Sequence, residues 1–464
     1  MTSSHLGGDI RWLLAIGLIG ALFLGCALVW WHIGPEIVLA AVVGGAALVV
    51  LMITPLMGVH ILLMLIFFER IAVLPEGWTL MKVLAPLIMA AWLMNLVLTR
   101  RTTIRFGPFM MSIFAFVAWS GLSLFYASDT GEALERLGTL AQLAVAALMI
   151  SSVLDSPRRI RQILWAVVIW MAVGTVIGFV NFNLGVTKVL TGPEENRNGF
   201  ALFLDIAIIC AFLLQQQTSS RIARLVLMFG LIPMFLLALA FTLSRAGWIS
   251  LLVGVGLVWM RAASERRFLP VVAMMAILCV IIPFLPEAFW NRAGTILPSM
   301  KERTDTFGQR VDLWGLGLEM IQKHPVLGVG IGNFIPMSAR YARGGLRTSA
   351  NGAHNSYVQV AAETGLIGLV LFLWIHALAL RSAARAIRQG AALGLRELRL
   401  GGIAVEVGIL VMMVMALSGS MEGTKLVWVF LGMANSLGAI SARLEIRRAA
   451  EEASVLLAPA AVPS

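Results

Sequence analysis

The chain has 464 residues, of which 59% are hydrophobic and only 13% are charged, whereas about 25% of residues in a soluble domain are charged. The apolar residues form long continuous runs, so the composition excludes a soluble enzyme and indicates an all-α polytopic membrane protein. The formal net charge is +11, but the basic residues lie mostly in short loops between apolar runs. This distribution is a topology signal, and we expect no nucleic-acid partner.

About 20 apolar residues are needed to cross the hydrocarbon core of a bilayer, and the apolar runs predict roughly 12 to 14 transmembrane helices. The count is a range because Pro55 either divides two spans or kinks one. The candidate spans are residues 10–31, 36–54, 55–68, 79–98, 107–126, 137–154, 163–183, 199–214, 225–243, 246–262, 268–285, 364–380, 400–418 and 426–441.

Arginine-rich loops alternate with arginine-poor ones along the chain. Because arginines prefer the cytoplasmic side, both termini are predicted to lie inside and the one long polar segment outside. That segment contains a helix-like run at 308–323, so we expect it to form a helical cap. We therefore divide the chain into an N-terminal transmembrane bundle (1–285), a cap formed by one long loop (286–356), C-terminal transmembrane helices (357–448) and a disordered tail (449–464).

Three arginines lie at the outer ends of predicted spans. Arg136 and Arg197 each precede a span closely, and Arg245 lies in the short break between two spans. For any one of them, snorkelling or pairing with a nearby carboxylate is an equally good explanation. Several arginines at the same depth favour an anionic ligand, and their planar charged forks suit phosphate oxygens. We predict that they bind a lipid-linked diphosphate.

Arg310 and Trp314 are four residues apart in the predicted cap helix and so share one face. A guanidinium beside an aromatic ring can hold a sugar phosphate, and the alternative is that the two side chains stack only to stabilise the cap. Asp305, Asp312 and Glu319 are spaced by seven, but no histidine or further aspartate joins them. We therefore expect no metal site.

The most informative stretch lies where the polar segment returns to apolar sequence. If it is helical, Asn355, Gln359 and Glu363 form one polar stripe, and His354 stands at the helix start, facing the outer loop. Polar groups are costly to bury at a membrane, so they indicate a site at its surface. The alternative is that Glu363 pairs with an arginine while His354 only caps the helix.

The order of these motifs resembles the O-antigen ligase and polymerase superfamily. The resemblance covers roughly residues 190 to 380, and its last motif is the most specific. The motifs are Asn196-Arg-Asn-Gly, Ser244-Arg-Ala-Gly-Trp, Arg310 with Trp314 and His324-Pro-Val-Leu-Gly-Val-Gly, and His354-Asn-Ser-Tyr followed by Glu363-Thr-Gly-Leu-Ile-Gly.

The resemblance implies a glycosyltransferase of the bacterial inner membrane with a periplasmic active site. A ligase of this family moves a glycan from undecaprenyl diphosphate onto lipid A–core and uses no cofactor. The implied partners are therefore this donor, this acceptor and membrane lipids, and the cap would be periplasmic. We expect His354 to act as general base, with inversion at the anomeric carbon. The implied catalytic residues are His354, Arg245 and Glu363, the diphosphate ligands Arg197, Arg245, Arg136 and Arg310, and the further candidates Asn355, Gln359 and Trp314.

Two alternatives remain open at this point. A polymerase joins lipid-linked repeats, and we favour a ligase because the chain has one dominant outer loop, whereas polymerases tend to have two. An anion transporter would place polar residues at mid-bilayer. Asp205 and Glu406 are the mid-span acids that suggest a transporter, and internal pairing is the simpler explanation for both.

Overall fold

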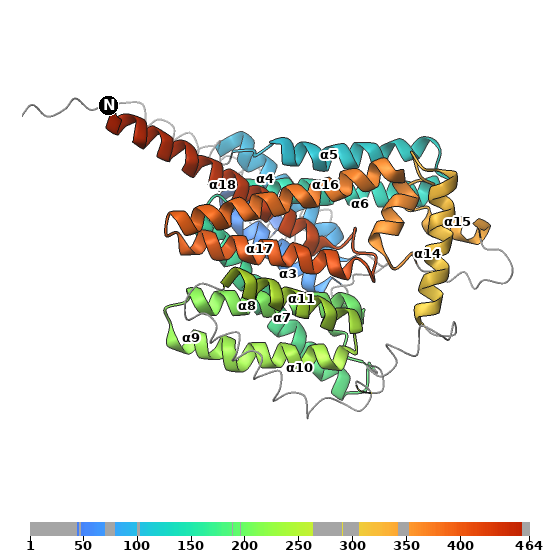
Figure 1. The fold of residues 1–464 in the computed structure, drawn as a ribbon, viewed down its shortest axis with the longest axis horizontal. Coiled ribbons are helices and arrows are strands. Elements are labelled where there is room, and N and C mark those ends of the chain that lie inside the picture. Colours follow the sequence, from blue (N-terminus) through green and yellow to red (C-terminus); the bar gives the residue numbers. More distant parts are fainter. Residues whose placement is uncertain are drawn as a thin grey trace, which may run out of the picture.

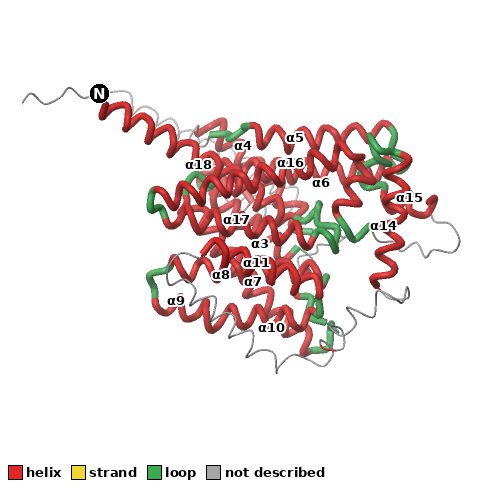
Figure 2. The backbone as a smooth tube through the Cα atoms, in the orientation of Figure 1, coloured by secondary structure: helices red, strands yellow, loops and turns green. Residues whose placement is uncertain are grey.

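The computed structural model describes residues 44–45, 48–69, 79–99, 103–187, 189–194, 196–262, 290, 306–341 and 352–456. Within these ranges the regular elements are all helices (Figure 2). Nine of the described helices are long and apolar enough to cross a membrane, which confirms an all-α polytopic membrane protein. The predicted spans 10–31 and 268–285, with most of 36–54, lie outside the described residues.

The long helices correspond to the predicted apolar runs, and several continue beyond them into polar sequence. The elements are α3 (Pro55–Phe68), α4 (Leu80–Thr99), α5 (Pro108–Gly121), η2 (Leu122–Phe125), α6 (Thr130–Val153), α7 (Pro157–Asn183), η3 (Gly192–Glu194), α8 (Arg197–Gln217), α9 (Arg221–Leu225), η4 (Val226–Leu231), α10 (Ile232–Thr242), α11 (Arg245–Ala262), α14 (Thr306–Lys323), α15 (Phe334–Tyr341), α16 (Ser356–Ala392), α17 (Arg396–Met415) and α18 (Lys425–Leu456).

The spanning helices lie side by side, and α14 runs across one end of them (Figure 1). We call this the cap end. Helices α8 and α17 form the centre of the bundle, where most of their side chains are buried against their neighbours. A bundle in lipid depends on such close packing between helices, because lipid tails solvate apolar side chains as well as the interior does.

The cap helix α14 confirms the predicted helix-like run at 308–323. It packs on the first turns of α16 through a small apolar cluster that includes Leu313, Met320 and Ala362. Close approach is possible because residue 317 is glycine, where a Cβ atom would lie 2.4 Å from Cγ1 of Val358. The cap is thus fixed directly over the segment that the sequence analysis singled out.

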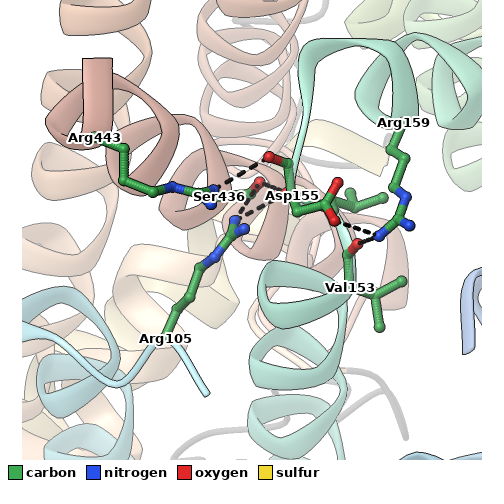
Figure 3. A network of polar contacts seen from close by, with 7 residues as sticks. Arg105, Val153, Asp155, Arg159, Ser436 and Arg443 are labelled. Atoms are coloured by element: carbon green, nitrogen blue, oxygen red, sulfur yellow. Dashed lines mark hydrogen bonds and ion pairs between the residues drawn. The ribbon is translucent and has the colours of Figure 1, made fainter. Parts of the chain in front are cut away.

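The opposite end of the bundle carries a polar network that joins α18 to the α6–α7 corner (Figure 3). Arg105 donates to the carbonyl oxygen of Leu154 at 2.9 Å and to the hydroxyl of Ser436 at 3.1 Å, while Arg443 donates to the carbonyl oxygen of Asp155 at 3.1 Å. Burial, and then repulsion from Arg443, lower the pKa of Arg105 to about 10, so it stays charged at neutral pH. These bonds fix the corner by satisfying its last carbonyl groups.

Helix α18 reaches Leu456, beyond residue 449, where the disordered tail was predicted to begin. The physical reason is that its last turns are polar but carry ion pairs four residues apart, which stabilise an exposed helix by about 0.2–0.5 kcal/mol each. These pairs are Arg447–Glu451 and Arg448–Glu452. Residues 457–464 lie outside the described part of the chain.

Candidate active site

Helix α16 is broken at Gly365, which has φ 69° and ψ −178°. The break frees backbone groups, and the loop that follows α14 takes them up. Leu366 donates to the carbonyl oxygen of Pro325, and Val329 donates to that of Ala362, each at 2.8 Å. Trp119 supplies an indole bond to the carbonyl oxygen of Thr364, also at 2.8 Å. The first two turns of α16 are therefore a separate short helix. They are held in place by the loop that follows α14, which we call the cap loop.

The Glu363 carboxylate lies inside this arrangement and is buried. It accepts hydrogen bonds from the backbone N–H groups of Gly332 at 2.9 Å and Phe334 at 3.4 Å, and from the side-chain amide of Gln359 at 3.2 Å. Phe334 is the first residue of α15, so the carboxylate occupies the position of a helix N-cap. Glu363 thereby ties α15, and Gly332 in the loop before it, to α16.

His354 adopts a left-handed backbone conformation, with φ 49°. A non-glycine residue in this region carries strain and persists only where its surroundings hold it. Three contacts do so. The carbonyl oxygen of Ala353 accepts a hydrogen bond from the Trp314 indole at 3.0 Å, and the backbone N–H of Ala353 donates to Gln359 Oε1 at 3.2 Å. On the other side, Asn355 caps α16 by accepting from two backbone N–H groups.

His354 lines a cavity of about 330 Å³ that we call the arginine cavity. Its wall combines the start of α8, one face of α14, the segment before α16 and the loop before α18. The lining residues are Asn196, Arg197, Asn198, Gln309, Arg310, Leu313, Gly352, His354, Gly419, Ser420 and Met421. This described lining contains two guanidinium groups and an imidazole, and no acidic side chain.

Three helix N-termini meet around the arginine cavity. Asn196 caps α8 through its side chain, and Asn355 caps α16. Ser244, just before α11, donates to the side-chain oxygen of Asn198 at 2.8 Å and accepts from the N–H of Gly247 at 3.2 Å. Because helix N-termini carry partial positive charge, they add to the guanidinium groups in attracting an anion.

The electrostatics of the cavity favour an anion beside a neutral imidazole. Burial, and then repulsion from Arg310, lower the pKa of His354 below its usual range, so the ring is neutral at pH 7 and able to accept a proton. Burial and then the charge of Arg245 lower the pKa of Arg310. Arg245 is therefore close to Arg310, and a bound anion would relieve the repulsion between them.

Arg136 lies in a second cavity, of about 310 Å³, that we call the mixed-charge cavity. It adjoins the arginine cavity, since Gly352 and Ser420 line both. Its lining residues are Ile66, Glu69, Arg136, Gly199, Phe203, Ile335, Gly352, Gln359, Ser420, Glu422, Gly423, Thr424 and Lys425.

The structure thus divides the residues predicted for the site. Arg197, Arg310 and His354 line one cavity, with Arg245 nearby, whereas Arg136 and Gln359 line the next. Glu422 was not predicted from the sequence, because it belongs to no motif. Its one signal was a charged side chain in the short loop between the last two spans. Among the described residues, no group of three histidine, cysteine or acidic side chains is arranged to hold a metal ion.

Residues 229–373 match the family model described as O-antigen ligase. Over this region the chain is similar to the O-antigen ligase and polymerase superfamily, and the match supports the resemblance seen in the sequence. The matched region of this O-antigen ligase domain includes Arg245, Arg310, His354 and Glu363, and Arg197 precedes it. A search of curated proteins finds no significant match to the chain. The family supports ligase- or polymerase-type activity on lipid-linked glycans.

Proposed function

We propose that the protein is an O-antigen ligase, which transfers a glycan from undecaprenyl diphosphate to lipid A–core. The observation that carries the proposal is the arginine cavity, where a neutral imidazole shares about 330 Å³ with Arg197 and Arg310 and with no acidic lining residue. A diphosphate is the group that two guanidinium forks and three helix N-termini would attract.

The proposed reaction is a single displacement. The hydroxyl oxygen of the acceptor attacks the anomeric carbon of the donor glycan while its proton passes to the imidazole of His354. The new glycosidic C–O bond forms as the C–O bond to the diphosphate breaks, and the bonding electrons leave with undecaprenyl diphosphate. Arg197, Arg245 and Arg310 stabilise the developing negative charge. Attack from the face opposite the leaving group inverts the anomeric configuration.

The remaining candidates act through His354 and the cap. Trp314, Gln359 and Asn355 hold the backbone on both sides of His354, and Glu363 holds the loop between α14 and α15. We assign these four as positioning residues, because their polar atoms are engaged with backbone groups. Arg136 lines the neighbouring mixed-charge cavity and is not among the proposed diphosphate ligands.

The proposed location is the bacterial inner membrane, with the cap end in the periplasm. Arginines in or beside four helix connections support this orientation, since the α4–α5, α6–α7, α8–α9 and α16–α17 connections gather at the end opposite the cap (Figure 1). By the preference of arginine for the cytoplasmic side, that end would be cytoplasmic.

A transporter is a weaker candidate, because the two acids that suggested it are paired internally. Asp205 accepts a hydrogen bond from Ser250 at 2.5 Å through one oxygen, while its other oxygen is buried without a hydrogen-bond partner among the described residues. Glu406 binds Arg261 through both oxygens, at 2.6 and 2.7 Å. Both acids thus make contacts within the bundle, away from the two cavities at the cap end.

The test is a transfer assay with purified protein in lipid vesicles, an undecaprenyl diphosphate glycan, and lipid A–core present or absent. We expect glycan on lipid A–core, and a fall of about 10²–10⁴-fold in turnover for His354→Ala, the usual range for losing a general base. His324→Ala is the matched control, since this histidine is exposed at the end of α14.

Each failure of this assay has a distinct meaning. Longer lipid-linked chains formed without lipid A–core would replace the ligase proposal with a polymerase. Near-normal turnover of the His354 variant would remove the base assignment, and a product with retained anomeric configuration would exclude single displacement.

A further inference from the structure

The mixed-charge cavity differs in character from the arginine cavity beside it. Its lining includes the carboxylates of Glu69 and Glu422 and the cations Arg136 and Lys425, so its charges balance. Glu69 and Lys425 form an ion pair. A balanced site that offers both strong acceptors and strong donors suits a neutral ligand rich in hydroxyl groups, which can donate and accept at once.

The mixed-charge cavity lies where the acceptor would have to be for His354 to take its proton. His354 must take a proton from the acceptor hydroxyl, so the acceptor has to reach the imidazole from a side not occupied by the diphosphate. Gly352 and Ser420 line both cavities, and Gly352 lies two residues before His354. A sugar in the mixed-charge cavity would therefore meet the boundary at which transfer takes place.

Glu422 is the one carboxylate of this cavity with an unsatisfied atom. Its Oε2 is shielded and has no hydrogen-bond partner in the described structure. Burial raises the pKa of Glu422, and hydrogen bonding from its own backbone N–H and from the Ser356 side chain, together with the charge of Arg136, opposes that rise. The terminal torsion of a glutamate is broad, so a rotation about it would turn Oε2 toward the cavity that Glu422 lines. A hydroxyl donor there would remove the cost of the unpaired oxygen.

The loop that carries Glu422 is fixed to the active helix. Ser356, the first residue of α16, donates to the carbonyl oxygen of Gly419 at 3.0 Å and accepts from the N–H of Met421 at 2.6 Å. Ser420 donates to Gln359 Oε1 at 2.7 Å, and the same oxygen accepts from the Ala353 N–H, next to His354. The cavity wall and the base are thus held by one set of hydrogen bonds.

We propose that the mixed-charge cavity binds the acceptor sugar and that Glu422 is a specificity-determining residue, which accepts a hydrogen bond from an acceptor hydroxyl. This inference rests on the proposed transfer reaction. It makes Arg136 a residue of the acceptor side, hydrogen bonding to sugar oxygens, and leaves the diphosphate to the arginine cavity.

The test compares three variants of the full-length protein in vesicles. Glu422→Gln removes the charge at nearly constant shape. Gly423→Leu fills the cavity, since a Cβ atom there would have only Arg136 nearby, at 4.0 Å. Glu132→Gln is the control, an exposed acid on α6 that lines neither cavity. The readouts are KM for lipid A–core, KM for the donor, kcat, and the thermal unfolding temperature as a check on folding.

We expect both cavity variants to raise the acceptor KM about tenfold or more, which corresponds to about 1.4 kcal/mol, with the donor KM unchanged. An unchanged acceptor KM in the folded Gly423→Leu protein would overturn the proposal, as would an effect on the donor KM alone. If Glu422→Gln fails to fold, Gly423→Leu decides the outcome.

A binding experiment separates this inference from the transfer reaction. Deacylated core oligosaccharide is titrated into the purified protein, and heat of binding is recorded without donor. Binding by the wild type that is lost in Gly423→Leu supports the cavity even if no transfer is detected. No binding by the wild type overturns the cavity assignment, whatever the fate of the ligase proposal.

Discussion

Trp314→Phe tests whether the left-handed conformation of His354 is held from the cap. The substitution keeps a smaller aromatic ring on α14 and removes the indole N–H that bonds to the carbonyl oxygen of Ala353 at 3.0 Å. Ala353 is fully buried, so water does not replace the lost donor. An unsatisfied buried carbonyl costs about 1–3 kcal/mol. The strain at His354 is of similar size, about 1–3 kcal/mol, so this loss is large enough to release it.

The expected result is a fall in kcat of about 5- to 150-fold, because each 1.36 kcal/mol changes a rate tenfold. The donor KM should change little, since Arg197 and Arg310 stay in place. The assay is steady-state transfer to lipid A–core, with Trp314→Ala measured alongside. A Trp314→Phe enzyme with wild-type kcat would refute the reasoning. If Trp314→Ala were then inactive, the ring itself would matter and not its hydrogen bond.

Two further predictions follow from the site and from the break in α16. Because the pKa of His354 is lowered from 6.5 by burial and by Arg310, and the base form exists above that pKa, the acidic fall in kcat/KM should lie below pH 6.5. Arg310→Gln removes the repulsion and should move this fall to higher pH at saturating donor, and an unmoved profile would contradict the assignment. Gly365→Ala should destabilise the protein by about 2–5 kcal/mol, because φ is 69° and a Cβ atom would lie 2.0 Å from the carbonyl oxygen of Val326. Thermal unfolding in detergent measures this, with Gly256→Ala, which has open space at its Cβ position, expected to be neutral or slightly stabilising.

Hydropathy predicted the spanning helices well because the length of an apolar run follows the thickness of the bilayer. The predicted spans 163–183 and 199–214 lie within α7 and α8. Hydropathy predicted the ends of the helices poorly, since α6 begins at Thr130, several residues before the apolar run that starts at 137. Those first turns are stabilised by the Asp129 N-cap, which hydropathy does not report.

The sequence also predicted that the arginines and His354 lie near one end of the bundle, but not how they divide between cavities. Position along a span gives depth in the membrane and leaves open the position around the bundle. Arg136 therefore could not be separated from Arg197 and Arg310 without the packing of α6. The bond from Trp314 to Ala353 joins residues 39 positions apart, and no local pattern encodes such a contact.

The hydrogen bonds between the loop that follows α14 and the break in α16 mean that the cap is not an exchangeable module. Removing it would leave the N–H of Leu366 and the carbonyl oxygen of Ala362 without partners beside the membrane interior. Each unsatisfied backbone group in hydrocarbon costs several kcal/mol, which is comparable with the whole stability of many domains. Cap and bundle therefore have to fold, and to change in evolution, as a single unit.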